Sequence, residues 1–515
     1  MRTHFVYVIF SLLFLTACTA QSSVEKYDLL ITNARVIDGT GSKAFDADIM
    51  IHNGIIEQIG DIDPDQTKIN ETVDAGGRVV SPGFIDMHSH GNPLNTPLFQ
   101  NFLSMGVTTL SLGQDGRSVR TSDVAEWMNE IAENGLGPNI LHFQGHGTLR
   151  NLVDAPLEKL DEEYIRQMQQ LMDKALQAGS FGMTTGLEYQ PGSFADLTEL
   201  VEVAKPIARR GGLVMSHMRN EDNDKVKESV QELLELGRLS GTDVHISHIK
   251  IVFGNEVSQA EDILSLMEEA RSDGIHITAD IYPYHASYTG IGIVFPDWAK
   301  PPHKYNEVVE TRREELEEYI RNRVEARNGP EATLFGTSPW AGKTLQEVAD
   351  SLNKPFEKVL IDDIGPRGAG AAYFVMNEEV VRRFLQDPYV MISSDGSPTM
   401  QHPRSYGSFA KIIDTYVNGE QLFPIEEAIR KMTGLPAATL GLDNADNVTT
   451  PRGIIREGFA ADLLIFEPEN IKAMSTFDNP HQLAEGFDWV FVNGKAAIRD
   501  GNLDGRHGKV IKKSS

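Results

Sequence analysis

Short apolar runs alternate with amphipathic helical stretches over the interior of the chain, roughly residues 82–440. Each run has the length of a buried strand, and the stretches between them, such as residues 123–135, space their apolar positions as a helix does. This alternation is typical of parallel βα units, and eight of them predict an α/β fold that closes as a TIM-type (β/α)8 barrel. The eight runs lie at residues 83–90, 106–113, 139–145, 181–188, 212–217, 243–248, 275–282 and 389–395.

The interval between the seventh and eighth runs is much longer than the others. About 100 residues separate them, far more than a βα connection needs. The interval contains a strongly charged helical stretch at residues 306–327. We therefore predict that residues 283–380 form a cap inserted over the mouth of the barrel.

The two ends of the mature chain share another pattern. Residues 27–81 and 441–515 alternate apolar and polar positions in short runs separated by Gly, Asn and Asp, which is typical of β-hairpins. Neither half offers enough strands for a stable structure of its own. We predict that the two halves pair into one small β-sandwich domain, which the barrel interrupts.

Residues 1–17 combine a basic start with an apolar run that is too short to span a bilayer, which is typical of a signal peptide. The sequence Leu-Thr-Ala-Cys ending at Cys18 resembles a bacterial lipobox. This resemblance implies cleavage before Cys18 and a lipid anchor on its thiol, with residues 18–26 as a tether. It places the protein in the bacterial cell envelope, facing the periplasm or on the outer membrane. The alternative is an ordinary signal peptide cleaved near Ala20.

Composition narrows the function classes. The 515 residues carry 47 Lys+Arg against 74 Asp+Glu, a formal net charge of −27, which disfavours nucleic acid or an anionic membrane surface as a partner. Cys18 is the only cysteine, so the mature body has no disulfide framework and no cysteine-ligated metal site. We expect a small-molecule partner, with membrane contact only through the N-terminal lipid.

Histidines and an aspartate stand at the ends of the predicted strands, where barrels of this type carry their chemistry. His88 and His90 are two residues apart on the first run, so both face the same way. His217 ends the fifth run, His248 the sixth and Asp395 the eighth. Imidazoles and carboxylates are metal ligands. The pattern predicts a metal site, with zinc as the expected ion.

The chain also contains, in this order, the words PGFIDMHSH, GHGTLR, TTGLEYQPG, SHMRNE, SHIK, DIYPY, SSDG, HPRSYG and RGIIREGFAADLLIF. Together they resemble the amidohydrolase superfamily and, within it, the N-acyl-D-amino-acid deacylase (D-aminoacylase) family. The resemblance covers nearly the whole mature chain. It implies that the strand-end histidines and Asp395 hold one or two metals, and it fits the split β domain and the cap.

One sequence motif departs from the family pattern. The classical D-aminoacylases carry a metal-bridging cysteine after the second strand in a GNCG word, and here residues 113–116 read GQDG. Two dications held close together need an anionic ligand between them. Asp115 stands in the cysteine's own position, and Glu188 ends the fourth run. We expect Glu188 to bridge the metals, with Asp115 as the alternative, because Asp-Gly pairs usually form outward-facing turns.

The resemblance also implies roles in catalysis and substrate binding. A divalent metal lowers the pKa of a bound water and polarises an amide carbonyl, and Asp395 is expected to act as general base and then as general acid toward the departing amine. Arg404 is expected to clamp the substrate carboxylate, with Lys250 beside it. The side chains expected to line the mouth are Tyr189, His146 and Tyr282.

These patterns predict a metal-dependent hydrolase of non-peptide C–N amide bonds that releases a D-amino acid from its N-acyl form. Three alternatives stay open. The first is a dipeptidase for D-amino-acid or isoaspartyl dipeptides. The second is a cyclic-amide hydrolase of dihydroorotase or hydantoinase type. The third, from a different class, is an inactive zinc- or solute-binding lipoprotein that keeps the barrel. A carboxylate clamp favours the open-chain substrate, and a general base favours an enzyme over a binding protein.

Overall fold

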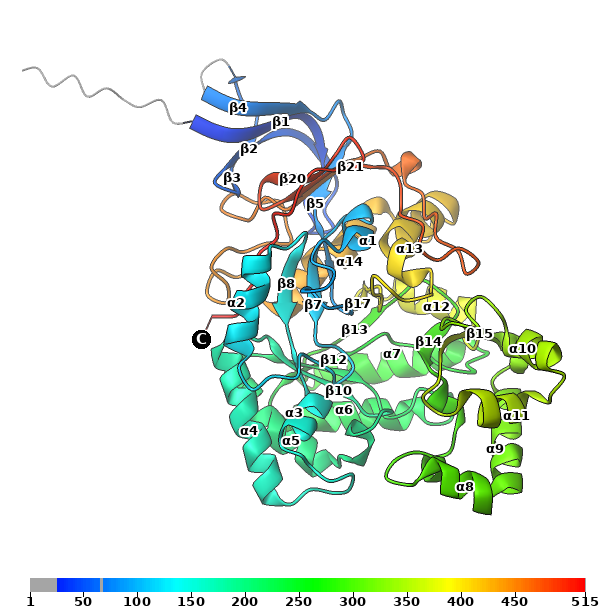
Figure 1. Ribbon diagram of the computed structural model, residues 1–515. Helices are drawn as coiled ribbons and strands as arrows, with labels where there is room; N and C mark the ends of the chain where they lie inside the picture. Colours follow the sequence, from blue (N-terminus) through cyan, green and yellow to red (C-terminus); the bar gives the residue numbers. More distant parts are fainter. Residues whose placement is uncertain (1–25, 65–67, 515) are drawn as a thin grey trace, which may run out of the picture.

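A computed structural model describes residues 26–64 and 68–514 of the chain. The predictions for the signal peptide and Cys18 lie outside these residues. The chain builds a barrel, a β domain at its top and a group of helices at one side of its mouth (Figure 1). None of the helices in the described ranges is both long and apolar enough to cross a membrane.

The barrel is built from parallel strands, as predicted. Its hydrogen-bonded neighbours run β6-β7-β8 and β9-β10-β11-β12-β13-β17, and every pair is parallel. A parallel bridge between Ser89 and Gly396 joins the first strand to the last. Each of the eight predicted runs contains one of these strands, and β8 and β9 lie in the same run. The strands are β6 (Phe84–Asp86), β7 (Val107–Leu112), β8 (Asn139–His142), β9 (Gln144–Gly145), β10 (Gly182–Gly186), β11 (Leu213–His217), β12 (Asp243–Ile246), β13 (Ile277–Ile281) and β17 (Val390–Ile392).

Helices surround the strands, and α4 (Glu162–Gln177) shows why they form. The side chain of Asp161 accepts hydrogen bonds from the first-turn N–H groups, which have no partner inside the helix. Met168, Met172 and Leu176 follow at four-residue spacing and are buried, each burial stabilising the fold by roughly 1.5–3 kcal/mol. The other barrel helices are α1 (Gln100–Ser104), α2 (Val124–Asn134), α3 (His146–Leu152), α5 (Leu197–Ala208), α6 (Val226–Ser240), α7 (Val257–Ser272), α12 (Glu378–Gln386), α13 (Arg404–Lys411), α14 (Ile425–Met432) and α15 (Gly434–Leu440).

The two chain ends pair into one nine-stranded sheet, which confirms that the β domain is made from both of them. The joint is β5, whose residues Val79–Pro82 pair antiparallel with Leu463–Phe466 of β18. Blue and red strands therefore lie together at the top of Figure 1. The sheet consists of β1 (Lys26–Val36), β2 (Phe45–His52), β3 (Ile55–Gly60), β4 (Lys68–Asp74), β5 (Val79–Pro82), β18 (Leu463–Phe466), β19 (Phe487–Val492), β20 (Lys495–Arg499) and β21 (Asn502–Leu503).

The cap lies between the seventh and eighth barrel strands, as predicted. It contains a small antiparallel sheet in the order β14-β16-β15 and four helices, with a hydrophobic core that includes Leu316, Ile320 and Val324. The charged stretch expected to be one helix is two, α8 and α9, which meet at Arg312. The cap elements are β14 (Ser287–Gly290), α8 (Tyr305–Thr311), α9 (Arg313–Ala326), β15 (Thr333–Phe335), α10 (Leu345–Leu352), α11 (Phe356–Val359) and β16 (Gly370–Tyr373).

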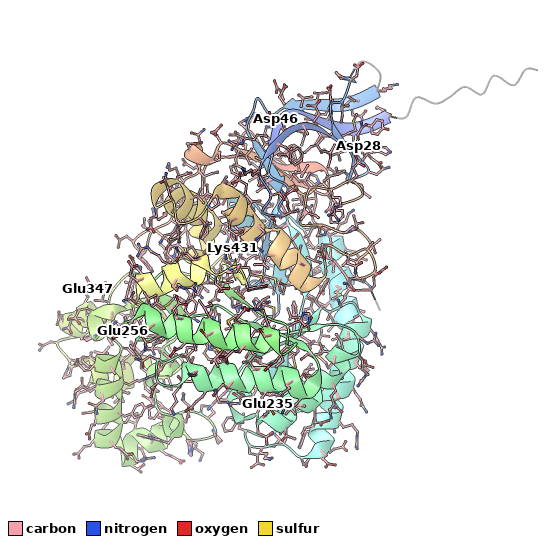
Figure 2. All side chains as sticks on the ribbon, turned by 180° about the vertical axis from the view of Figure 1, so that it is seen from behind. Asp28, Asp46, Glu235, Glu256, Glu347 and Lys431 are labelled. Atoms are coloured by element: carbon pink, nitrogen blue, oxygen red, sulfur yellow. The ribbon has the colours of Figure 1, made fainter. Side chains whose placement is uncertain are left out.

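One lysine is buried at the amino end of the last barrel strand. Lys431 of α14, labelled in Figure 2, is fully buried according to its exposed surface, and its Nζ donates hydrogen bonds to the backbone oxygens of Asp387 and Val390. Burial lowers the pKa of Lys431 from 10.5 to about 8. The neutral amine keeps donors for both carbonyls, so the fold tolerates loss of the charge.

The buried lysine makes the stability of the protein depend on pH. Since its folded-state pKa lies below the ordinary value, the unfolded chain binds more protons between about pH 8 and pH 10.5, and stability rises with pH across that window. Relative to Lys431→Met, the wild type should gain on the order of 2–3 kcal/mol of unfolding free energy from pH 8 to pH 10.5. Urea denaturation of both proteins at the two pH values measures this gain, and parallel pH profiles would contradict it.

Candidate metal centre

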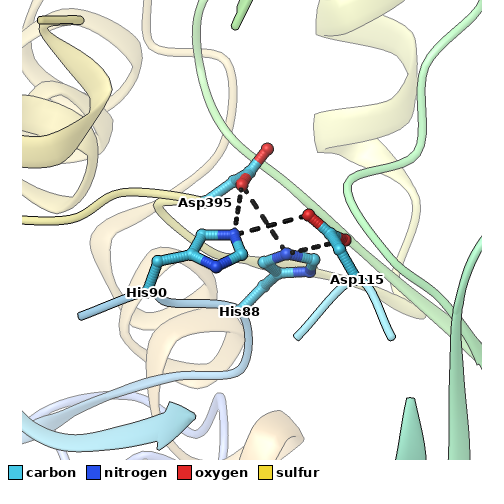
Figure 3. A group of neighbouring side chains, drawn as sticks. All are labelled: His88, His90, Asp115 and Asp395. Carbon is cyan, nitrogen blue, oxygen red and sulfur yellow. Dashed lines mark hydrogen bonds and ion pairs between the residues drawn. The ribbon is translucent and has the colours of Figure 1, made fainter. Parts of the chain in front are cut away.

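The first strand brings two histidines to the barrel mouth. His88 and His90 follow β6, and their Nε2 atoms lie 3.6 and 3.1 Å from Oδ1 of Asp395, which follows β17 (Figure 3). His88 is fully buried, whereas the side chain of His90 is 29% exposed. The backbone N–H of Asp395 donates to the carbonyl oxygen of His88 at 2.8 Å, which fixes the last strand against the first.

Asp115 lies at the centre of the site. Its Oδ1 is 3.3 Å from Nε2 of His88 and 3.3 Å from Nε2 of His248, and its Oδ2 is 3.4 Å from Nε2 of His90. The residue stands three positions after the end of β7 with a left-handed backbone, φ 53°. This conformation, which Asp tolerates better than most residues, turns the carboxylate into the barrel instead of out to solvent.

A second pair of histidines lies on the other side of Asp115. His217 ends β11 and His248 follows β12, and Nδ1 of His217 lies 2.8 Å from Nε2 of His248. Nδ1 of His217 is 3.7 Å from Oδ1 of Asp115. Asp115 therefore contacts all four strand-end histidines predicted from the sequence.

Glu188 occupies a more peripheral place than expected. Its Oε2 lies 3.2 Å from Nε2 of His217, and it forms a ligand-like group with His217 and Glu221, away from the first-strand pair. The preference for Glu188 as the group between the two histidine pairs is therefore corrected in favour of its alternative, Asp115. The physical reason is the left-handed turn, which aims the short Asp115 side chain at the point where the strands converge.

The carboxylates of the site favour a positive charge on the groups that they surround. Burial alone would lower the pKa of His90, but hydrogen bonds to Asp115 and Asp395 raise it to about 9. Burial and Lys250 would lower the pKa of His248, but Glu221 and Asp115 raise it to about 10. Conversely, burial would raise the pKa of Asp115, but His88, His248 and His90 hold it well below its usual range. The carboxylates are ionised and surround a position that suits a cation.

The donor set fits a pair of divalent metals. Two groups of possible ligands share Asp115, and within each group the ligand atoms lie within 4.8 Å of one another. Both ring nitrogens of the buried His88 lack a hydrogen-bond partner within the described part of the chain. Such an imidazole is costly to bury unless a ligand uses it. The two groups are His88, His90, Asp115 and Asp395, and Asp115, His217 and His248.

Two buried aspartates that are not among the predicted site residues support the ligands. Oδ1 of Asp280 on β13 accepts a hydrogen bond from the backbone N–H of His248 at 3.0 Å, and its Oδ2 lies 2.7 Å from Nε2 of His245. Asp86 on β6 accepts from the backbone N–H of His88 at 3.1 Å and from the Ser394 hydroxyl. Carboxylates of this kind orient metal-binding histidines. The sequence offered one clue, since Asp86 is two residues before His88 and shares its face.

Three of the residues predicted to bind substrate lie at the site. Nη1 of Arg404 forms an ion pair with Oδ2 of Asp395 at 2.9 Å, and its Nε is buried without a partner in the described ranges. Its guanidinium lies over the ring of Tyr282, 4.7 Å from the centroid. Nζ of Lys250 lies 2.7 Å from both Glu221 and Nδ1 of His248. Arg404, Tyr282 and Lys250 all line the same pocket, which Asp115 also lines.

Tyr189 and His146 were also predicted to line the mouth of the barrel, and only Tyr189 does so. Tyr189 lines the same pocket, with its ring centroid 4.4 Å from that of His217. His146 does not line it. Its Nε2 lies 2.9 Å from Oε1 of Glu199, whose two oxygens also accept hydrogen bonds from Arg150. His146 begins α3 and is used to tie that helix to α5, so the prediction that it lines the mouth is wrong.

Comparison with known proteins agrees with this site. A profile of the amidohydrolase family matches residues 357–498. The D-aminoacylase of Alcaligenes xylosoxydans xylosoxydans is 30% identical to the chain over 96% of the chain and 100% of its own length. The chain belongs to the D-aminoacylase family of amidohydrolases. The family resemblance inferred from the sequence is thereby confirmed.

Two solved structures of D-aminoacylase-type enzymes share the fold. The N-acyl-D-glutamate deacylase of Bordetella bronchiseptica, solved with zinc and a phosphonate that mimics the tetrahedral intermediate, has a TM-score of 0.81 at 30% identity, covering 95% of this chain and 100% of that one. A D-aminoacylase studied for its binuclear metal centre has a TM-score of 0.80 at 29% identity, covering 94% and 100%. The fold of this chain is thus similar to both structures over nearly its whole length.

Proposed function

We propose that this protein is a metal-dependent hydrolase that cleaves the amide bond of N-acyl-D-amino acids. One observation carries the proposal: the carboxylate of Asp115 contacts both histidine pairs, with Asp395 and Arg404 beside them. The relatives described above are a D-aminoacylase and an N-acyl-D-glutamate deacylase by name. This chain keeps a metal-ligand set and a carboxylate-binding cation in one pocket.

We assign the ligands as two groups that share Asp115. His88, His90 and Asp395 would hold one divalent ion, and His217 and His248 the other, with zinc as the expected metal because the Bordetella enzyme was solved with it. When bound, such an ion lowers the pKa of water toward neutrality and polarises the amide carbonyl. Glu188 remains available as a further ligand beside His217.

Asp395 is positioned to move the proton. Burial would raise the pKa of this carboxyl, but the charges of Arg404 and His88 hold it below its usual range, so it is ionised at neutral pH. An ionised carboxylate accepts the proton of the attacking water and can return it to the nitrogen of the departing amine. The amine needs that proton, because an amide anion is too basic to leave.

Arg404 is the group that favours an open-chain amino-acid substrate. Its buried guanidinium has an Nε without a partner among the described residues and stacks on Tyr282, so it offers a rigid planar donor to the α-carboxylate. Lys250 adds positive charge to the same pocket. A cyclic amide presents no free α-carboxylate beside the scissile bond.

A substrate panel tests the proposed function. The purified mature protein with zinc should hydrolyse N-acetyl-D-amino acids, leave their L forms intact and act weakly on α-carboxamide analogues. Dihydroorotate, a hydantoin and isoaspartyl or D-containing dipeptides represent the alternative enzymes. Preferential hydrolysis of any of these would replace the proposal, and inactivity on every member would favour a binding protein.

We further propose that the enzyme is a lipoprotein anchored through Cys18 in the bacterial envelope. The support is the basic start, the short apolar run and the Leu-Thr-Ala-Cys sequence. Cys18→Ser should leave the protein unlipidated and move it from the membrane fraction to the soluble fraction, while the purified variant keeps its activity. Labelling with a radioactive fatty acid and fractionation measure this, and retention of the variant by membranes in high salt would contradict the anchor.

A further inference from the structure

Arg327 is a buried cation in the wall of the active-site pocket, and it has no anionic partner in the part of the chain that the structure describes. It follows the last residue of α9, Ala326, and only 2% of its surface is exposed. It lines the same pocket as Glu188 and Asp115. Within residues 26–64 and 68–514 its guanidinium makes no ion pair and donates no hydrogen bond, and its Nε is buried.

Other arginines of the cap helix α9 form ion pairs with carboxylates. One turn earlier, Arg323 forms an ion pair with Asp222 at 2.9 Å, and Arg321 pairs with Glu357 at 2.7 Å. Arg327 instead faces aromatic rings, with its Cζ 5.0 Å from the centroid of Tyr373 and 5.6 Å from that of Phe253. A buried charge without a counter-ion is costly, so a chain that keeps one in a binding pocket provides for a charged ligand.

The Tyr373 hydroxyl, beside Arg327, also lacks a hydrogen-bond partner among the described residues. The hydroxyl of Tyr373 is buried and has no hydrogen-bond partner in the described part of the chain. Tyr373 ends β16 of the cap sheet, next to Ser287 of β14, which itself lines the pocket. Next to a guanidinium that lines the pocket, the cap therefore also holds a buried hydroxyl without a partner among the described residues. A planar guanidinium matches a carboxylate best among common substrate groups.

We propose that Arg327 binds a second carboxylate of the substrate, in addition to the α-carboxylate that Arg404 receives. The inference rests on the proposed function and narrows its substrate to dicarboxylic N-acyl-D-amino acids. Arg404 belongs to a barrel helix and Arg327 to the cap, so two cations reach one pocket from different parts of the fold. The second carboxylate belongs either to an acidic side chain or to a dicarboxylic acyl group.

Matched pairs of substrates distinguish these two sources. N-acetyl-D-glutamate against N-acetyl-D-glutamine varies the side chain, and N-succinyl-D-leucine against its succinamoyl analogue varies the acyl group. The wild type should prefer the carboxylate member of one pair by at least about tenfold in kcat/KM. Arg327→Met should lower kcat/KM for that member by about 10–100-fold and change the neutral member by less than about threefold. Arg321→Met, on the same helix but paired with Glu357, is the matched control and should change neither.

Equal losses on both members of each pair would mean that Arg327 serves the structure or Glu188, and would overturn the proposal. Absence of any preference in the wild type would do the same. A binding measurement separates this failure from failure of the proposed function. Calorimetry of the zinc-loaded protein should show glutarate binding that exceeds butyrate binding and is lost in Arg327→Met. If glutarate binds both proteins equally, the inference fails whether or not N-acyl-D-amino acids are hydrolysed.

Discussion

Asp395→Asn is expected to lower kcat by about 10²–10⁴-fold, the usual contribution of a positioned general acid–base. Asparagine keeps the shape of the side chain and an oxygen that can face His90, but it cannot accept the proton of the attacking water. KM should change little, since the loss falls on the chemical step. Steady-state kinetics on an N-acetyl-D-amino acid measures the effect.

Metal content and a control variant make this result specific. Elemental analysis of Asp395→Asn should show most of the metal retained, because the four histidines and Asp115 remain as ligands. Asp414→Asn, which loses only an ion pair to the exposed Lys472, should keep wild-type turnover. Normal turnover of Asp395→Asn would place the general base on another residue.

The second large effect is expected at Asp115. Replacing it by asparagine keeps a residue that tolerates the left-handed backbone, φ 53°, and removes only the negative charge. Substitutions in the outer shell of metal sites already cost about 10–100-fold, so removal of a shared anionic ligand should cost more than about 10²-fold in kcat/KM. We expect Asp115→Asn to lose at least one of its two metals as well.

A comparison of variants shows whether Asp115 holds the metals together. Asp115→Cys supplies the thiolate that the family resemblance places at this position, so it should recover metal and part of the activity. Glu188→Gln should be milder, because Glu188 contacts His217 and not the first-strand pair. An unchanged metal-to-protein ratio in Asp115→Asn, together with metal loss in Glu188→Gln, would return the role to Glu188.

The sequence predicted the fold because strand and helix periods are local patterns. Each apolar run contains at least one barrel strand, and residues two apart, such as His88 and His90, had to share a face. The order of the runs then placed His217, His248 and Asp395 at the same mouth. These inferences needed no knowledge of how distant side chains pack.

The errors lie where tertiary packing decides. Asp-Gly pairs usually make exposed turns, but the left-handed backbone of Asp115 turns its carboxylate toward the point where the strands converge. His146 belongs to a sequence motif that resembles the family's, yet its imidazole is hydrogen-bonded to Glu199, which lies 53 residues later in the chain. Arg327 could not be singled out from the sequence either, because the pairing of each arginine depends on tertiary packing. The sequence shows several arginines in and after a charged helix but does not show which of them forms an ion pair with a carboxylate.

Metal-dependent and D-specific hydrolysis is the central claim, and one measurement tests it directly. The mature protein is stripped of metal with a chelator, and its hydrolysis of N-acetyl-D- and N-acetyl-L-amino acids is followed while zinc is added back. We expect no activity without metal, recovery of activity with zinc, and release of the D-amino acid alone. Full activity in the stripped protein, or equal rates on the L forms, would contradict the assignment.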